Sequence, residues 1–365
     1  MNILIIKTSA IGDVTHTLPA LNAIRRRYPD AHIAWLVEEA AADLVVGQPA
    51  LDRVLVSGRK RWLQELKGPK RLDAIRELFG FIRQVRDTEY DLLIDFQGLL
   101  KSSMWVALAR AKRKVGFGRG MEHSEFSYLF LNERVPPVSM EVHAAERQLL
   151  LLKRLGMEAG KPKMDIPAEE RHEREVDRLL KEAGLSGHTP LAVVNAVTTW
   201  PTKHWEDEKF AQVADGLLGR GWKVVFSGGP GDRERIEQIR ASMRHQAYSA
   251  AGKTSLKTLA ALFRRARVVI TIDTGPMHIA AAVGTPVVAL FGPTAPWRTG
   301  PVGDNHIIVR EKLSCSPCYR KTCESVRCMR NISTERVLEA VEEISEGKTA
   351  SSCRDAAEER KARHF

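Results

Sequence analysis

The chain has 365 residues, 44% of them hydrophobic, and this length is enough for about two domains that each bury a core. Its formal net charge of +11 at pH 7 indicates either a solvated basic surface or an acidic partner, such as a phosphorylated substrate, anionic lipid or nucleic acid. The opening residues lack the pattern of a signal peptide, and no apolar stretch reaches the roughly 20 residues that span a membrane, so we expect a cytoplasmic protein.

Short apolar strands alternate with amphipathic helices along the first half of the chain, which is typical of a doubly wound parallel sheet. We predict strands at Asn2–Ile6, His32–Val37, Val54–Ser57, Asp91–Asp95 and Lys114–Phe117. Helices are predicted at Leu18–Arg27, Asp73–Arg86, Leu99–Ala111 and His143–Leu155. A polar stretch over residues 157–189, with charges, prolines and glycines, then marks a boundary.

The same alternation restarts in the second half. Strands are predicted at Leu191–Asn195, Lys223–Ser227, Val268–Ile272, Val287–Phe291 and His306–Val309. Helices are predicted at Asp207–Arg220, Asp232–Met243, Leu256–Arg265, Pro276–Val283 and Thr334–Ser345. We therefore expect an α/β protein with two Rossmann-like doubly wound domains facing across a cleft, at 1–165 and 185–333. A closing helix at 334–345 and a charged, mobile tail at 346–365 complete the expected arrangement.

The ten residues Asp273–Ala282 contain a phosphate-binding pattern. The apolar run Val268–Ile272 leads directly into this segment, and a helix of small residues follows with His278 in its first turn. The first N–H groups of a helix have no partner within the helix, and the helix dipole is positive at that end. This terminus therefore favours a bound phosphate group.

Asp13 lies in a second segment in which a predicted strand leads through a loop into a helix, here after the first strand of the chain. Residues 7–14 lack the G-x-G-x-x-G spacing of a dinucleotide-binding turn, which argues against a dehydrogenase. Two interpretations of Asp13 stay open. The carboxylate either complements the helix dipole from the first turn, or acts as a general base at the carboxyl edge of the sheet.

Two further loops in the second half carry polar groups after predicted strands. Thr198, Thr199 and Lys203 offer two hydroxyls and an ammonium group, which suits a diphosphate; the alternative is a polar loop with capping threonines. The glycines of residues 227–232 let a ligand approach the backbone closely. Asp232 either accepts hydrogen bonds from ribose hydroxyls or caps the helix that follows.

Together, these segments resemble the bacterial lipopolysaccharide heptosyltransferases, the ADP-heptose-dependent group of glycosyltransferase family nine. The resemblance rests on residues 7–19, 95–102, 198–199, 203–205, 273–278 and 291–294, which occur in the expected order. Residues 35–39 and 59–62 favour heptosyltransferase I, which acts on the Kdo sugar of lipid A.

The resemblance implies a GT-B fold and an inverting transfer of L-glycero-D-manno-heptose from ADP-heptose to Kdo, without a cofactor or a dedicated metal. Asp13 then becomes the general base. The implied donor-binding residues are Thr198, Thr199, Lys203, Asp232, Asp273, Thr274, Gly275 and His278. For His278, the alternative is a buried histidine bonded within the helix terminus. The leaving diphosphate gains charge, which Lys203 and the helix terminus can stabilise without a protonating acid.

Acceptor binding is assigned to basic and loop residues of the first half. These residues are Lys7, Gly12, Arg59, Lys60, Arg61, Lys101, Arg119, His143 and Arg147. Either Arg119 or His123 takes the place of the family's acceptor-side arginine. His143 and Arg147 are spaced i and i+4 on a predicted helix, where they either meet an acidic sugar or phosphate or form a solvated face.

Four of the five cysteines lie close together in the sequence, at Cys315, Cys318, Cys323 and Cys328. Four thiols at short spacing can ligate zinc or an iron–sulfur cluster, but this spacing differs from the paired C-x2-C motifs of a zinc ribbon. A cytosolic protein is not expected to need disulfides. We therefore favour a structural role over a metal site.

Two alternatives to heptosyltransferase I remain. Heptosyltransferase II, or another family member, shares the fold but uses a different acceptor or sugar. A nucleotide- or nucleic-acid-binding protein would explain the charge, but aromatic residues make up only 6% of the chain and no nucleic-acid-binding motif is present. We expect Kdo–lipid A or core lipopolysaccharide as the acceptor, no nucleic acid, a monomer, and peripheral attachment to the anionic cytoplasmic face of the inner membrane.

Overall fold

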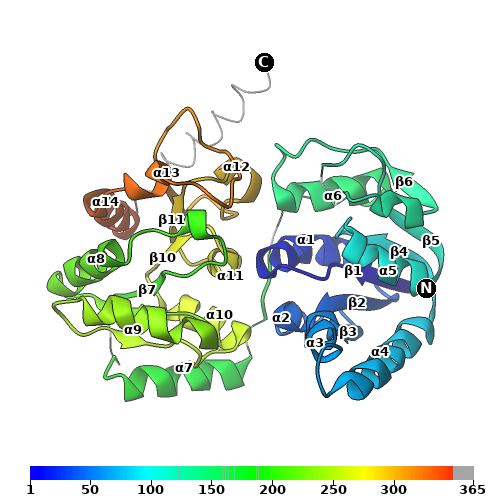
Figure 1. Ribbon diagram of the computed structural model, residues 1–365, viewed down its shortest axis with the longest axis horizontal. Helices are drawn as coiled ribbons and strands as arrows, with labels where there is room; N and C mark the ends of the chain where they lie inside the picture. Colours follow the sequence, from blue (N-terminus) through cyan, green and yellow to red (C-terminus); the bar gives the residue numbers. More distant parts are fainter. Residues whose placement is uncertain are drawn as a thin grey trace. The chain divides into compact units, whose positions relative to one another are not determined.

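A computed structural model describes residues 1–122, 124–158, 160, 162, 164–167, 169–185, 187 and 189–347. The chain divides into two compact units, Met1–Asp165 and Ile166–Phe365, and each contains a six-stranded sheet covered by helices (Figure 1). The predicted pair of doubly wound α/β units is therefore confirmed. His123 and the tail after residue 347, which the sequence assigned to acceptor binding and to a mobile end, lie outside the described residues.

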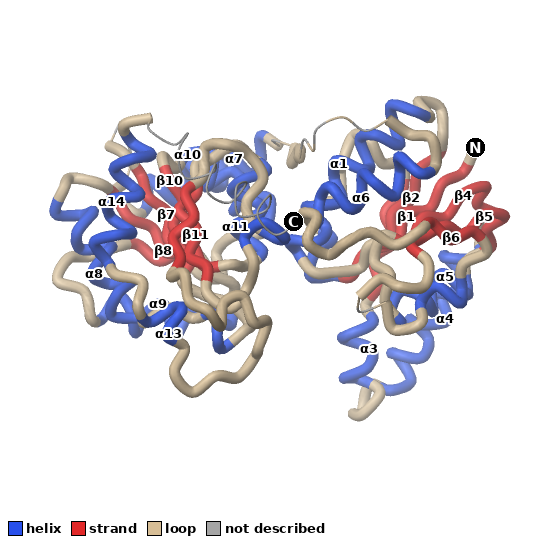
Figure 2. Tube along the Cα trace, turned by 90° about the horizontal axis from the view of Figure 1, so that it is seen from above, coloured by secondary structure: helices blue, strands red, loops and turns tan. Residues whose placement is uncertain are grey.

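The first unit has the strand order β3-β2-β1-β4-β5-β6, with neighbouring strands parallel. Its strands are β1 Asn2–Ile6, β2 His32–Glu38, β3 Arg53–Ser57, β4 Glu89–Asp95, β5 Arg110–Phe117 and β6 Glu133–Val135. Its helices are α1 Ile11–Arg27, α2 Glu39–Ala42, α3 Arg59–Glu65, α4 Arg71–Arg86, α5 Leu100–Leu108 and α6 Ala144–Arg154. Helices α1 and α6 lie on one face of the sheet, and α3, α4 and α5 lie on the other (Figure 2).

The second unit repeats this topology with the strand order β12-β11-β10-β7-β8-β9, also parallel. Its strands are β7 Leu191–Asn195, β8 Lys223–Phe226, β9 Tyr248–Ser249, β10 Val268–Ile272, β11 Val287–Phe291 and β12 Ile307–Arg310. Its helices are α7 Glu170–Glu182, α8 Asp207–Gly219, α9 Arg233–Ala241, α10 Leu256–Arg265, α11 Gly275–Ala282, α12 Pro296–Thr299, α13 Arg327–Arg330 and α14 Thr334–Ser345. Helices α8, α9 and α14 cover one face, and α7, α10 and α11 cover the other.

The central strands are continuous apolar runs because helices bury them on both faces. Every residue of β7, β10 and β11 is buried, and these strands have the predicted bounds. No helix in the described part of the chain is long and apolar enough to cross a membrane.

Helix α7 lies within the polar stretch for which no helix was predicted. Only three of its residues are buried, His172, Val176 and Leu179, and they form a narrow stripe at spacings of four and three. This stripe packs on α10, where His172 Nδ1 lies 3.0 Å from the hydroxyl of Thr258. Tertiary packing therefore stabilises a helix whose composition resembles that of a linker.

Each sheet has one switch point, where the chain changes the direction in which it adds strands. The switch lies between β1 and β4 in the first unit, with Ile6 paired to Asp95, and between β7 and β10 in the second, with Asn195 paired to Thr271. Loops that leave such a strand pair diverge to opposite faces of the sheet and leave space for a ligand. The main candidate residues of both units follow these four strands.

Candidate functional site

Lys7 and Asp95 mark the switch point of the first unit. Lys7 follows β1, and its buried Nζ donates a hydrogen bond to the carbonyl of Phe96 at 3.0 Å. Burial lowers the pKa of Lys7, while Asp13 and Asp95 act in the opposite direction. A lysine held in this way can present positive charge to an anionic ligand at the sheet edge.

Asp95 is a buried carboxylate that sequence reasoning did not select as a site residue. Its Oδ1 accepts hydrogen bonds from the N–H groups of Gln97 at 3.0 Å and Gly98 at 3.1 Å, and its Oδ2 accepts one from Ser102 Oγ at 3.1 Å. Burial nevertheless raises the pKa of Asp95 to about 6, because these bonds and Lys7 offset only part of the desolvation. The sequence signal was a carboxylate at the end of an apolar strand.

Gln97 connects the two loops at this switch point. Its Oε1 accepts hydrogen bonds from Thr8 N, Thr8 Oγ1 and Ser9 N, each at 3.1 Å. One side-chain oxygen thus fixes the loop after β1 against the loop after β4. Gln97 was also missed as a functional residue, because a single glutamine in a loop has no distinctive pattern.

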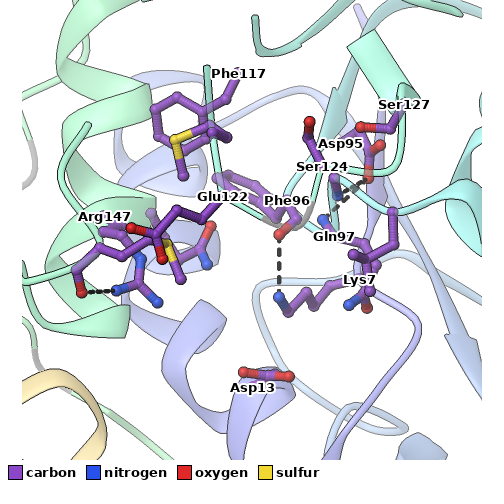
Figure 3. A pocket seen from close by; sticks show the side chains of 15 residues that line it. Lys7, Asp13, Asp95, Phe96, Gln97, Phe117, Glu122, Ser124, Ser127 and Arg147 are labelled. Carbon is purple, nitrogen blue, oxygen red and sulfur yellow. Dashed lines mark hydrogen bonds between the residues drawn. The ribbon is translucent and has the colours of Figure 1, made fainter. Parts of the chain in front are cut away.

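A cavity of about 290 Å³ opens beside these residues (Figure 3). Lys7, Asp13, Asp95, Glu122 and Arg147 supply its charged groups. Phe96, Phe117, Met121 and Met140 supply apolar surface. Such a mixture suits a ligand with sugar hydroxyls and anionic groups rather than a purely apolar ligand.

Asp13 occupies the third position of α1 and lines this cavity. Its Oδ2 accepts a hydrogen bond from the N–H of Ala10 at 3.2 Å, so the carboxylate stabilises the helix terminus. The side chain is only half-buried, and Figure 3 shows it facing the same space as Lys7. The geometry is thus compatible with both interpretations of Asp13. Gly12 is buried beside it and offers only its backbone.

Several charged groups gather near the loop that carries Asp13. Lys101, at the start of α5, donates a hydrogen bond to the hydroxyl of Ser9. Burial lowers the pKa of Lys101, with Glu38 opposing this shift and Arg59 adding to it. Glu38 binds Arg59 Nη2 at 2.8 Å and Lys60 Nζ at 3.9 Å. The structure therefore brings Lys101, Arg59 and Lys60 close together, although none of them lines the cavity, and their contact with an acceptor stays a prediction.

Arg61 and Arg119 do not line the cavity. Arg61 instead forms ion pairs with Glu39 at 3.1 Å, Glu65 at 3.3 Å and Glu77 at 2.7 Å. Arg119 is exposed in the turn after β5. The geometry gives these two residues less support as acceptor ligands than it gives Lys7 and Arg147, which line the cavity.

His143 and Arg147 have different roles from those their spacing suggested. His143 is the N-cap of α6 rather than a helical residue, and its Nδ1 accepts a hydrogen bond from Ala145 N at 3.2 Å. The two rings of His143 and His16 meet edge to face, with centroids 5.2 Å apart. Arg147 Nη1 donates to the carbonyls of Met140 at 3.0 Å and Val142 at 2.6 Å. Arg147 reaches the cavity, whereas His143 mainly stabilises the helix terminus.

Lys203 and Asp273 mark the switch point of the second unit. Lys203 Nζ lies 2.6 Å from Asp273 Oδ2, and Thr294 Oγ1 donates to the same oxygen at 2.7 Å. The three residues come from the loops after β7, β10 and β11, which are adjacent strands. The predicted gathering of Lys203 with the segment at Asp273 is thus present, but the carboxylate already engages the ammonium group.

The ring of Trp200 contacts two cations in this region, Lys203 and Lys321. Lys203 Nζ lies 4.6 Å from the centroid of the Trp200 ring, and Lys321 Nζ lies 5.1 Å from it. Both distances suit a cation–π contact. Thr198 is half-buried and Thr199 exposed in the same loop, where the N–H of Trp200 donates to Thr198 Oγ1 at 3.4 Å. Lys321 was missed because it is distant in sequence and carries no motif.

Helix α11 begins beside Asp273. Thr274 is its N-cap in an extended conformation and makes no side-chain capping bond, and Gly275 and Pro276 open the helix. His278 follows in the first turn and is buried. The predicted strand, turn and helix are therefore present at these residues, while their contact with phosphate stays a prediction.

Asp232 caps its own turn. Its Oδ2 accepts a hydrogen bond from the N–H of Gly229 at 2.7 Å, just before α9 begins. A Cβ on Gly228 would lie 2.7 Å from Ile236 Cδ1 and 3.0 Å from Asp232 Cβ, so a larger residue there would displace these side chains. The Asp232 side chain makes no capping bond to α9, so it closes the turn before the helix rather than capping the helix itself, and the ribose contact stays a prediction.

The cysteine-rich loop packs on the loops of this second site. Ser316 Oγ donates to the carbonyl of Gly292 at 2.6 Å, and Thr202 Oγ1 donates to that of Arg320 at 2.7 Å. The four cysteines of the loop are free thiols, with Cys328 buried. Across the residues that the structure describes, no group of three or more His, Cys, Asp or Glu side chains is arranged to hold a metal ion.

Comparison with known proteins identifies the family. The model of glycosyltransferase family 9 (heptosyltransferase) matches residues 78–328, which is more than half of the chain. The chain belongs to glycosyltransferase family 9. It is therefore a glycosyltransferase, and the predicted resemblance to heptosyltransferases is confirmed.

Individual family 9 proteins support this result. Lipopolysaccharide heptosyltransferase 1 of Pseudomonas aeruginosa is 34% identical over 326 residues, which cover 88% of this chain and 87% of that protein. The structure of the Escherichia coli heptosyltransferase WaaC with ADP is 26% identical, with a TM-score of 0.76 and coverage of 94% and 100%. The structure of WaaC with ADP-2-deoxy-2-fluoro heptose has a TM-score of 0.74 at 26% identity, with coverage of 94% and 99%. The family 9 chain thus has the GT-B fold.

Proposed function

We propose that this family 9 enzyme transfers L-glycero-D-manno-heptose from ADP-heptose to a Kdo residue of the lipopolysaccharide inner core, with inversion at the transferred carbon. The observation that carries the proposal is the cluster of Lys203, Asp273 and Thr294 beside the first turn of α11, in a fold shared with a heptosyltransferase that binds ADP. The similarity to the Pseudomonas aeruginosa heptosyltransferase 1 supports the type I enzyme, for which the family resemblance implies Kdo as the acceptor.

The donor diphosphate binds at the switch point of the second unit in this proposal. The Lys203 ammonium group then binds both Asp273 and a phosphate oxygen of the donor. The N–H groups at the start of α11 bind the same phosphate group. Thr198, Thr199, Thr274, Gly275 and His278 complete the diphosphate site, and Asp232 contacts the ribose. Asp273 keeps Lys203 oriented and is itself held by Thr294.

The acceptor binds at the switch point of the first unit. Lys7, Arg147 and Lys101 offer positive charge to the carboxylate of Kdo, and Arg59 and Lys60 extend this charge along α3. The backbone of Gly12 allows the sugar to approach. Arg61, Arg119 and His143 contribute indirectly, through the positions of the helix and loops that carry them.

The transfer then needs one base and one stabilised leaving group. Asp13 accepts the proton of the acceptor hydroxyl. The oxygen of that hydroxyl bonds to the anomeric carbon of the heptose as the bond from this carbon to the diphosphate breaks. The departing electron pair stays on ADP, whose charge Lys203 and α11 stabilise. No cofactor or dedicated metal takes part in the proposed reaction. The enzyme works as a monomer at the cytoplasmic face of the inner membrane.

The test is ADP release by the purified enzyme, supplied with ADP-heptose and one of two acceptors. The first is Kdo2–lipid A stripped of its acyl chains, and the second is the same acceptor already carrying one heptose. We expect release with the first only. Release with the second alone selects heptosyltransferase II, and release with neither overturns the proposal. Mass spectrometry of the lipopolysaccharide core from cells without the enzyme should show truncation at Kdo.

A further inference from the structure

Helices α3 and α4 form a hairpin that carries much of the positive charge of the chain. Residues 59–86 contain nine Lys or Arg and three Asp or Glu residues, a net charge of +6 compared with +11 for the whole chain. Trp62 joins the two helices: its ring lies 5.5 Å from that of Phe81, and its Nε1 donates to Glu77 at 2.9 Å. Figure 2 shows the two helices side by side on one face of the sheet of the first unit.

Helix α4 has two apolar faces, although only one faces the core. Ala74, Phe81 and Val85 are buried. Leu72, Ile75 and Phe79 recur at spacings of three and four and therefore share another face, which we call the exposed stripe. Leu72 is 72% exposed and Phe79 is 66% exposed. Helix α3 adds Leu63, which is 51% exposed. Packing within the unit does not explain these side chains, and contiguous exposed apolar groups mark interaction surfaces.

Basic residues lie next to the exposed stripe in the sequence. Arg76 and Arg83 each lie four residues after a stripe residue and so project from nearly the same side of α4. Five exposed cations of the hairpin form no ion pair with any residue that the structure describes: Lys67, Lys70, Arg71, Arg76 and Arg83. By contrast, Arg59 and Arg61 are engaged with Glu38 and Glu77. The surface therefore combines apolar side chains with uncompensated positive charge.

We propose that this hairpin docks the enzyme on an anionic phospholipid bilayer. The exposed stripe enters the boundary between headgroups and acyl chains, and the five cations contact lipid phosphates. The charge favours this occupant over a second copy of the chain, because two hairpins of net charge +6 would repel each other. The purpose of docking rests on the proposed function: α3 starts at Arg59 and Lys60, next to the proposed acceptor site, so docking brings that site to a lipid-linked sugar.

Flotation of the full chain with vesicles tests the proposal without any donor or acceptor. We expect binding to mixed phosphatidylglycerol–phosphatidylcholine vesicles, weak binding to pure phosphatidylcholine, and a loss of binding at high salt. The double variant Leu72→Ser/Phe79→Ser should bind about tenfold more weakly or worse. The matched control is Phe126→Ser/Leu129→Ser, because these residues are also 68% and 60% exposed in the same unit. This control should bind as the wild type does.

A charge variant keeps the test independent of the apolar substitutions. Arg76→Gln/Arg83→Gln should also weaken binding to the anionic vesicles about tenfold and flatten its salt dependence. Arg178→Gln/Lys181→Gln, two exposed cations of α7, should leave binding unchanged. The proposal is overturned if both hairpin variants bind as the wild type does, or if the control variants lose binding equally. It is also overturned if light scattering shows that the wild type is a dimer and the stripe variant a monomer, and the stripe variant still binds vesicles.

Activity separates this proposal from the proposed function. The stripe variant should release ADP at the wild-type rate with the acyl-free acceptor, and more slowly with acylated acceptor embedded in vesicles. If the wild type binds vesicles through the hairpin but transfers no heptose, the docking surface stands and the proposed function fails. If transfer to embedded acceptor is unaffected in a variant that no longer floats, docking through this hairpin is refuted.

Discussion

Lys203 Nζ lies 2.6 Å from Asp273 Oδ2, and this contact joins the loops after the two strands at the switch point of the second unit. The first unit also has a lysine and a carboxylate at its switch point, but not at matching positions: Lys7 directly follows β1 and Asp95 is the last residue of β4. The two pairs differ in their contacts. Lys203 engages its carboxylate directly, whereas Lys7 donates to the carbonyl of Phe96.

Lys203→Met should weaken ADP binding by about 10- to 100-fold, because a charge-assisted hydrogen bond contributes roughly 1.5–3 kcal/mol. The loss has a second cause, since Asp273 would then repel the diphosphate without a neighbouring ammonium group. Isothermal titration calorimetry with ADP provides the measurement. Lys253→Met is the matched control, because its Nζ also lies over a ring, 4.4 Å from the centroid of Tyr248. Equal affinities in the two variants would remove Lys203 from the donor site.

Asp13→Asn should reduce turnover by about 100- to 10,000-fold, the range typical of a lost general base. The asparagine oxygen can still accept the hydrogen bond from Ala10, so the melting temperature should change little. ADP affinity should be unaffected, because the donor residues lie in the other unit. Steady-state kinetics, calorimetry and thermal melting together check these three expectations. Substantial turnover in the variant would leave Asp13 only its capping role.

The buried carboxyl of Asp95 should make stability depend on pH. Burial raises its pKa from 3.8 to about 6 in the folded state. The folded state thus binds the proton more tightly than the unfolded state, so this stabilisation is present below about pH 4 and is lost as the pH rises through about 6. A shift of about two units corresponds to about 3 kcal/mol.

Asp95→Asn should remove this dependence. Relative to the wild type, the free energy of unfolding of the variant should rise by about 3 kcal/mol from about pH 4 to about pH 7, measured by urea unfolding. Asp91→Asn is the control: the N–H of Asn2 and Lys112 lower the pKa of Asp91, so its contribution changes only at lower pH. If the difference in unfolding free energy from the wild type does not change with pH for either variant, the pKa of Asp95 is not raised.

Gln97→Ala should destabilise the first unit by about 1–3 kcal/mol, because it leaves the N–H groups of Thr8 and Ser9 without their acceptor. It should also lower turnover, since the loop that carries Lys7 loses its connection to the loop after β4. Urea unfolding and kinetics measure the two effects. Gln212→Ala, at an exposed position of α8, should be nearly neutral. A stable variant with normal turnover would show that the connection is dispensable.

Much of the fold follows from hydrophobic pattern alone. β1, β7, β10 and β11 have the predicted bounds, because strands covered on both faces appear as uninterrupted apolar runs. The edge strands β6 and β9 were missed since they have only three and two residues and no apolar run. The edge strands β3 and β12, which have five and four residues and several apolar side chains, were predicted to within one residue, so length and apolar content decide which strands the pattern detects.

The site was predicted less completely than the fold. Loops after strands identified Asp13, Lys203 and Asp273, because parallel strands end at one edge. The contact between Lys203 and Asp273 joins residues 70 apart, so it follows from strand order, which the sequence does not reveal. Gln97 escaped selection for the same reason, because its role depends on the β1 loop beside it. The bonds of Asp95 are local, and only its burial, which the sequence does not show, distinguishes it from other carboxylates at strand ends.

The switch points also set the order in which each site can form during folding. The bond from Lys7 to the carbonyl of Phe96 spans 89 residues, and the pair of Lys203 and Asp273 spans 70. Contacts at such separation carry a large loop-closure entropy and are favoured only after intervening elements have packed. The binding residues of each unit should therefore assemble late, after three strands and their helices are in place. Ligand binding by either half would then report that its folding is complete.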